Sequence, residues 1–176
     1  MTLLVAVLAV LLSGSAQHPT MPAGMSHEEH LKQMEKDAAL NKRGAATMGF
    51  DQNTTVHHFR LSPTGGSIDV DVRRPSDTAT RAQIRVHLKQ IADDFANGNF
   101  SKPTVIHAEV PNGVTELRKH RDATGYRYEE TPGGARVVIT TNEPSALEAV
   151  HAFLRYQIME HKTSDPTNTK GGRPRR

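Results

Sequence analysis

The 176-residue sequence contains no cysteine and no tryptophan. Without cysteine the chain has no disulfide bond, no thiolate nucleophile, no iron–sulfur ligation and no covalent haem attachment. Aromatic residues make up 5% of the chain and hydrophobic residues 36%, so we expect one domain with a modest, mainly aliphatic core. The net charge is only +3 at pH 7, which argues against nucleic acid as a partner.

Several short enzyme fingerprints are also missing. The sequence has no Gly-x-Ser-x-Gly, no P-loop and no dinucleotide-binding pattern. His27-Glu-Glu-His30 is not a zincin motif, because that motif needs its two histidines four residues apart. Glu148-x-x-His151 has the spacing of one half of a di-iron site, but Gln83 to Val86 gives no second copy in the matching helix.

The first twelve residues form an apolar run without charge. A membrane-spanning helix needs about 20 such residues, so this run is too short to cross a bilayer. Small residues follow, ending at Ala16. The pattern predicts a signal peptide over residues 1–16, export to the periplasm or the medium, and no stable membrane insertion after cleavage. The alternative is a buried N-terminal helix.

Residues 54–95 predict a β-hairpin followed by an amphipathic helix. The first strand covers residues 56–61, and the second covers residues 67–72 with strict alternation of apolar and polar side chains. A Gly-Gly pair at residues 65–66 lies between them. The helix begins after Ser76 or Asp77, a helix cap, and its apolar residues are Ile84, Leu88, Ile91 and Phe95.

The same pattern occurs a second time. Residues 126–130 and 136–141 read as strands around a second Gly-Gly pair, and a helix follows with Leu147, Val150, Leu154 and Ile158 on one stripe. Neither unit buries enough apolar surface to stand alone. The sequence therefore predicts an α+β fold: two ββα units forming a four-stranded antiparallel sheet with two helices packed on one face, plus an N-terminal polar helix. Chance similarity of two hairpin–helix segments is the alternative to duplication.

The remaining segments set the expected domain organisation. Residues 17–47 are expected to form a flexible segment and a polar helix from His27 to about Lys42, started by the capping box Ser26-x-x-Glu29. The duplicated domain spans 48–162. Within it, Val105 to Val110 predicts a short strand. Residues 163–176 lack apolar side chains and predict a disordered basic tail.

Four sequence segments carry a resemblance to known proteins. These are Met48-Gly-Phe-Asp-Gln52, His57-His-Phe-Arg-Leu61, Gly65-Gly-Ser-Ile-Asp-Val70 and the helix from Ala149 to His161. Over roughly residues 44–165 the chain resembles a family of uncharacterised exported bacterial proteins. The resemblance implies export and the domain boundaries, and it implies no particular activity.

Ten histidines are the outstanding feature of the composition. Met25, His27, His30 and Met34 lie close together near the N-terminus. On a helix His27, His30 and Met34 share one face. Thioether and imidazole together favour copper, especially Cu(I). A solvated linker helix is the other interpretation of this segment.

A second group of histidines lies inside the repeat. Alternation places His57 on the core face with Phe59, His87 lies beside the stripe of the first helix, and His151 lies beside that of the second. Three such imidazoles that converge would resemble a zinc or copper site. Ordinary core or rim histidines are the other interpretation. His107 has no assigned partner, and His161 is expected to be solvated.

We therefore expect an exported transition-metal-binding protein, with copper favoured over zinc, that acts as a chaperone, buffer or sensor. A non-enzymatic interaction module with a protein partner of the cell envelope is the first alternative. A hydrolase-type enzyme that uses His57, His87 or His151 is the second. No catalytic residue is assigned.

Overall fold

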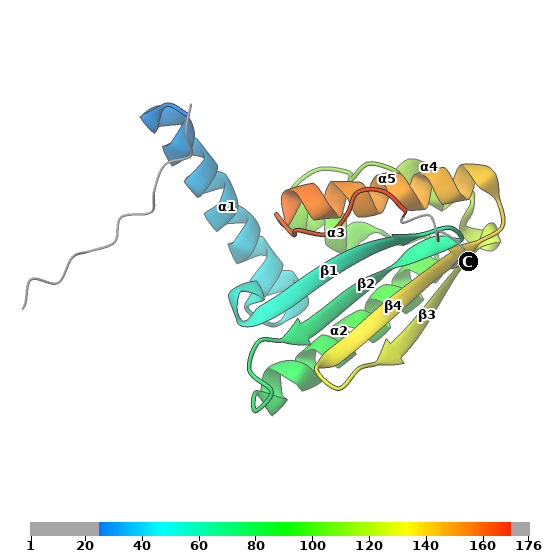
Figure 1. Ribbon diagram of the computed structural model, residues 1–176, viewed down its shortest axis with the longest axis horizontal. Helices are drawn as coiled ribbons and strands as arrows, with labels where there is room; N and C mark the ends of the chain where they lie inside the picture. Colours follow the sequence, from blue (N-terminus) through cyan, green and yellow to red (C-terminus); the bar gives the residue numbers. More distant parts are fainter. Residues whose placement is uncertain (1–24, 170–176) are drawn as a thin grey trace, which may run out of the picture. The chain divides into compact units, whose positions relative to one another are not determined.

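The computed structural model describes residues 25–169 (Figure 1). The predicted signal peptide lies outside these residues. None of the helices in the described part of the chain is long and apolar enough to cross a membrane. The chain divides into two compact units, residues 1–35 and 36–176. The sheet, the helices after α1 and every residue of the site described below belong to the second unit.

The sheet confirms the predicted fold class. Its strands are β1 (Thr55–Ser62), β2 (Gly65–Val72), β3 (Thr124–Glu130) and β4 (Gly134–Thr141), in the order β1-β2-β4-β3. All neighbouring pairs are antiparallel. The two hairpins thus meet at their second strands, β2 and β4. This arrangement leaves β1 and β3 as the edges of the sheet.

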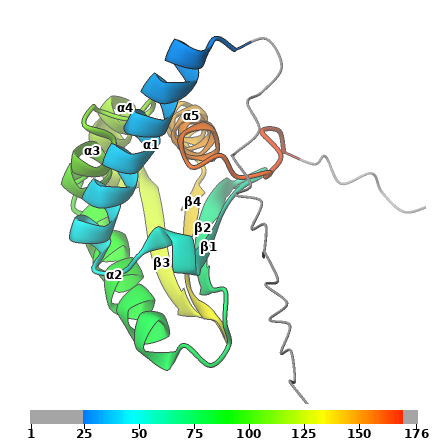
Figure 2. The ribbon, with the colours of Figure 1, turned by 90° about the vertical axis from the view of Figure 1, so that its left-hand side faces the viewer.

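Two long helices cover one face of the sheet, as Figure 2 shows. Helix α2 (Thr78–Ala96) begins after Asp77, whose side chain accepts a hydrogen bond from the Thr80 amide. Helix α5 (Pro144–Glu160) has proline in its first turn and Glu143 as its cap. Helix α2 packs mainly on β3 and β4, whereas α5 packs mainly on β1 and β2. Because each helix covers the other unit's hairpin, neither ββα unit has a core of its own.

The Gly-Gly pairs bring backbone segments close together in both ββα units. A Cβ atom at Gly66 would collide with the Arg60 carbonyl and with the Leu154 side chain of α5. A Cβ atom at Gly134 would collide with the Val70 carbonyl and press on Ile84 of α2. The second glycine of each pair therefore lets a helix approach the start of a central strand.

The core lies between the sheet and the two helices. Ile84, Val150 and Leu154 are fully buried there. At one end the rings of Phe95 and Phe100 stack with their centroids 4.3 Å apart. The aliphatic core expected from the composition is thus supplemented by a small aromatic cluster.

The segment between the repeats is helical, and the predicted strand at Val105 to Val110 is wrong. It forms α3 (Ser101–His107), α4 (Val114–Lys119) and the 3₁₀ turn η2 (Arg121–Ala123). Helix α3 ends at Ala108, which has a left-handed backbone conformation with φ of 59°. The β-branched residues of this segment favour a strand locally, but burial of Ile106 against the core favours the helix.

Helix α1 (His27–Met48) extends beyond its predicted end near Lys42, and η1 (Gln52–Thr54) follows it. Leu40, Gly44 and Met48 are buried. Arg43 Nε donates a hydrogen bond of 2.8 Å to the Ile106 carbonyl. The last turns of α1 are therefore part of the domain.

Residues 163–169 also differ from the expectation, because they are ordered against the domain. The chain reverses at Lys162, which has a φ of 51°. Asp165 then reaches edge strand β1, where its carboxylate accepts a 3.0 Å hydrogen bond from the Phe59 amide. The same carboxylate lies 2.9 Å from His58 Nδ1. Asp165 thus occupies one backbone donor of the open edge strand.

Candidate functional site

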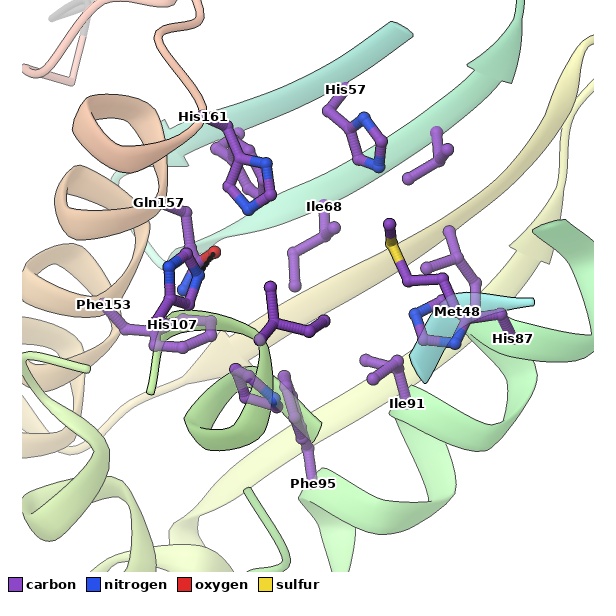
Figure 3. A pocket seen from close by; sticks show the side chains of 15 residues that line it. Met48, His57, Ile68, His87, Ile91, Phe95, His107, Phe153, Gln157 and His161 are labelled. Carbon is purple, nitrogen blue, oxygen red and sulfur yellow. Dashed lines mark hydrogen bonds between the residues drawn. The ribbon is translucent and has the colours of Figure 1, made fainter. Parts of the chain in front are cut away.

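Four histidines line one pocket on the core side of the sheet (Figure 3). His57 comes from β1, His87 from α2, His107 from the end of α3, and His161 directly follows α5. The pocket has a volume of about 60 Å³, and its other lining residues are mostly apolar. Residues from six parts of the chain, Met48 of α1 and two residues of β2 included, therefore meet at one small cavity.

Ordinary strand and helix periodicity places two of these imidazoles. His57 alternates with Phe59, which is 3% exposed, so both face the helices. His87 lies between Ile84 and Leu88 on the buried stripe of α2, and it is 6% exposed. Both positions agree with the prediction from the sequence.

The expectation that His161 is solvated is wrong. His161 lies seven residues after Leu154 and four after Gln157, and both of these are buried. The stripe of α5 therefore continues to His161, and the chain turns away only at Lys162. Residue spacing alone points to this orientation, but the polar sequence that follows hides it.

The rings of His57, His107 and His161 form a chain of contacts. His57 and His161 are stacked, with centroids 5.5 Å apart and planes at 24°. His107 meets His161 edge to face at 5.3 Å. Phe50 and Phe59 extend the stack on either side of His57, each at 6.4 Å. This packing places the imidazoles among aromatic rings.

Burial keeps these imidazoles uncharged at neutral pH. It is the largest cause that lowers the pKa of His57 to about 4, and the nearby His87 and Arg73 add to the effect. Burial, with Lys102 as a further cause, also lowers the pKa of His87 to about 4. For His161, burial and the neighbouring His57 and His107 lower the pKa to about 3. The pKa of His107 is lowered as well, again mainly by burial.

Some polar atoms at the pocket have no partner among the described residues. His107 Nε2 lies 3.0 Å from Gln157 Oε1. When Nε2–H donates to that oxygen, the neutral ring keeps a free lone pair on Nδ1. That Nδ1 atom, His57 Nε2 and Gln157 Nε2 are buried without a hydrogen bond. Unpaired buried groups of this kind are rare in native structures and call for an explanation such as a bound ion or water.

The structure brings only two of the three predicted domain ligands together. His57 and His87 line the pocket. His151 is not among its lining residues, because its Nε2 atom lies 2.9 Å from the Ser62 carbonyl and 3.1 Å from the Gly65 carbonyl. It donates to the β1–β2 turn and ties α5 to that turn. The predicted convergence is therefore wrong for His151, and His107 and His161 are the imidazoles that the sequence analysis missed.

The predicted group of methionine and histidine residues near the N-terminus lies at the start of α1. Met25 precedes the helix, and His27, His30 and Met34 follow within its first turns. His27 and Met34 are exposed, and His30 is half-buried. A role for this group in metal binding stays a prediction.

The pocket offers few ligand types. Within residues 25–169, no three His, Asp or Glu side chains are arranged to hold a metal ion. No carboxylate lines the pocket. Met48 does line it, and in the view of Figure 3 the Met48 thioether lies between His57 and His87. The available donors are therefore neutral imidazoles and one thioether.

Comparison of the chain with protein-family models, with curated proteins and with solved structures gave no match.

Proposed function

We propose that the protein binds a transition-metal ion, Cu(I) in preference to Zn(II), in the histidine-lined pocket. In this proposal it acts outside the cytoplasm as a copper chaperone, buffer or sensor. The observation that carries the proposal is a pocket lined by four histidines and the Met48 side chain, in which the buried ring nitrogens His57 Nε2 and His107 Nδ1 lack partners among the described residues. Imidazole and thioether are the donors that favour copper.

The size of the pocket favours an ion over an organic molecule. Pockets for drug-sized ligands and cofactors have volumes of about 300–1,000 Å³. The histidine-lined pocket measures about 60 Å³, well below that range. A space of this size favours a metal ion over a drug-sized organic ligand.

The charge of the pocket favours a monovalent ion. Transfer of an ion from water into an apolar environment is costly, and the cost grows with the square of its charge. A Zn²⁺ ion here would have no carboxylate among the lining residues to offset its charge. Cu(I) carries a single charge and is soft, so the Met48 thioether is a suitable ligand.

The protonation state of the histidines also suits metal binding. Imidazole binds a metal in its neutral form, so protons compete with the metal below the imidazole pKa. With the pKa of His57 at about 4 and that of His161 at about 3, both rings are available at neutral pH without loss of a proton. Metal binding then needs no release of a proton from either ring.

A competition titration tests the proposal. The full chain is titrated anaerobically with Cu(I) in the presence of a chromophoric Cu(I) chelator. We expect one tight Cu(I) per chain and weaker binding of Zn(II). His57→Phe and His161→Phe keep the ring stack and remove a ligand, so each should weaken Cu(I) binding by more than about tenfold, the minimum seen on loss of an outer-shell partner of a metal ligand.

Two controls locate the site. His120→Gln changes a histidine outside the pocket and should leave Cu(I) binding unchanged. A His27→Gln and His30→Gln double variant tests the group at the start of α1. If that double variant loses the ion while the pocket variants keep it, the pocket proposal is wrong and the N-terminal group is the site. Absence of Cu(I) binding by the full chain would overturn both the pocket site and the N-terminal site. Thermal unfolding of each variant shows whether weaker Cu(I) binding comes from the missing ligand or from loss of the fold.

A further inference from the structure

A second cavity lies on the outer side of the stacked pair His57 and His161. It has a volume of about 330 Å³ and is bordered by η1, β1, Arg73 and the segment that follows α5. This volume is at the lower end of the range for small-molecule pockets. In contrast to the histidine-lined pocket, its remaining lining is largely polar and includes Asn53, Thr163 and Ser164.

The charged groups of this outer cavity are of one sign. Arg73 and Lys162 line it, and no Asp or Glu does. Lys162 forms an ion pair with Asp37. Asp165, which directly follows the lining residue Ser164, is engaged by His58 and by the backbone of β1. Arg73 forms no ion pair with a carboxylate anywhere in residues 25–169, so its charge remains uncompensated.

One hydrogen bond holds the Arg73 side chain in position. Its Nε atom donates to the Asn53 carbonyl at a distance of 3.0 Å. The two terminal nitrogens of the guanidinium form no hydrogen bond with any of the residues that the structure describes. A guanidinium in this state presents a planar pair of N–H groups, which matches a carboxylate or a phosphate.

We propose that the outer cavity is a binding site for a small oxyanion, a molecule that carries a carboxylate or phosphate group, with Arg73 as the residue that pairs with it. The hydroxyl groups of Thr163 and Ser164 and the amide of Asn53 supply neutral donors around the anion. The site is independent of the proposed metal site, because it uses Arg73 and the polar lining rather than Met48 or the imidazole nitrogens.

The shared wall provides a second readout. His57 and His161 line both cavities, and the positive charge of Arg73 is one of the causes that lower the pKa of His57. An anion paired with Arg73 offsets that charge. Bound oxyanion should therefore shift the ring resonances of His57 and His161 in NMR spectra.

Calorimetric titration of the metal-free full chain tests the proposal. Citrate and inorganic phosphate serve as probes, and sodium chloride holds the ionic strength constant. We expect saturable binding of at least one probe, and the preferred probe distinguishes a carboxylate from a phosphate ligand. Arg73→Gln should weaken binding by about tenfold or more, the effect of losing a charged hydrogen-bond donor. Arg73→Lys, which keeps the charge without the planar fork, should show an intermediate loss.

Arg74 provides the matched control, because it is the next residue, is also exposed, and does not line the cavity. Arg74→Gln should change binding by less than about twofold, since a solvated charge outside the site is screened by salt. Equal losses in Arg73→Gln and Arg74→Gln would reduce the effect to general electrostatics and overturn the proposal. So would absence of binding of both probes, or binding that Arg73→Gln leaves intact. The Cu(I) titration of the same variants tests the proposed metal site separately, because neither Arg73 nor Arg74 supplies a metal ligand.

Discussion

Acidification should unfold the metal-free protein through the histidines of the pocket. In the unfolded chain these imidazoles have a pKa near 6.5, whereas in the folded protein the pKa is about 4 for His57 and His87 and about 3 for His161. Between these values the unfolded state binds more protons than the folded state. The free energy of unfolding must therefore fall as the pH drops below about 6.5, and it is independent of these groups above that pH.

The size of this effect follows from the shifts. One pKa unit corresponds to about 1.4 kcal/mol, so full protonation costs about 3 kcal/mol for His57 and the same for His87. For His161, whose pKa is the lowest, the figure is about 5 kcal/mol. Domains of this size are stable by about 5–15 kcal/mol in total. Part of each shift is the mutual repulsion of neighbouring imidazoles, so the contributions do not simply add. Together they are still comparable with that stability, and we expect unfolding between about pH 5 and pH 4.

Circular dichroism, followed across a pH series with EDTA present, measures the transition. His161→Phe keeps a ring on His57 and removes the residue with the largest shift, so its unfolding midpoint should lie about one pH unit lower. His120→Phe, outside the pocket, is the control and should unfold like the wild type. A free energy of unfolding that stays constant from pH 7 to pH 5, or a His161→Phe midpoint equal to that of the wild type, would refute the reasoning.

Two further predictions concern packing and the pH dependence of metal binding. Leu154→Ala and Leu88→Ala, which truncate side chains 0% and 2% exposed, should each destabilise the fold by about 2–5 kcal/mol in denaturant titrations. Near-zero effects at both positions would contradict the assigned core. Cu(I) affinity should stay constant from pH 7 to about pH 5 and then fall, because the pKa of His57 is about 4. A decline that already begins near pH 6.5 would indicate solvated imidazoles, such as those at the start of α1.

The fold could be predicted where local patterns and tertiary burial agree. Strict alternation in β2 and the four-residue spacing of Ile84 and Leu88 report directly which side faces the core. The prediction failed where a distant partner decides the conformation. Residues 163–169 contain no apolar side chain, yet the Asp165 carboxylate bonds to the Phe59 amide more than a hundred residues away. The composition of residues 163–169 does not indicate this contact.

The residues of the histidine-lined pocket could also be predicted only in part. His57 and His87 follow from strand and helix periodicity, and both line the pocket. His151 has equally good helical spacing, but the turn carbonyls of Ser62 and Gly65 compete for its ring. His107 could not be assigned, because α3 was read as a strand. The spacing from Leu154 to His161 was available in the sequence and was outweighed by the polar residues after it.

The four pocket histidines are poor choices for a core whose only task is stability. Leucine or phenylalanine at these positions would bury more apolar surface and leave no ring nitrogen unpaired, whereas His57 Nε2 and His107 Nδ1 have no partner among the described residues. The lowered pKa values of His57, His87 and His161 also make the fold sensitive to acid, as calculated above. Departures from good local design are expected at functional sites, where chemistry constrains the residue type. We therefore take the cost of these imidazoles to stability as an argument that a bound group, rather than packing, explains their presence in the pocket.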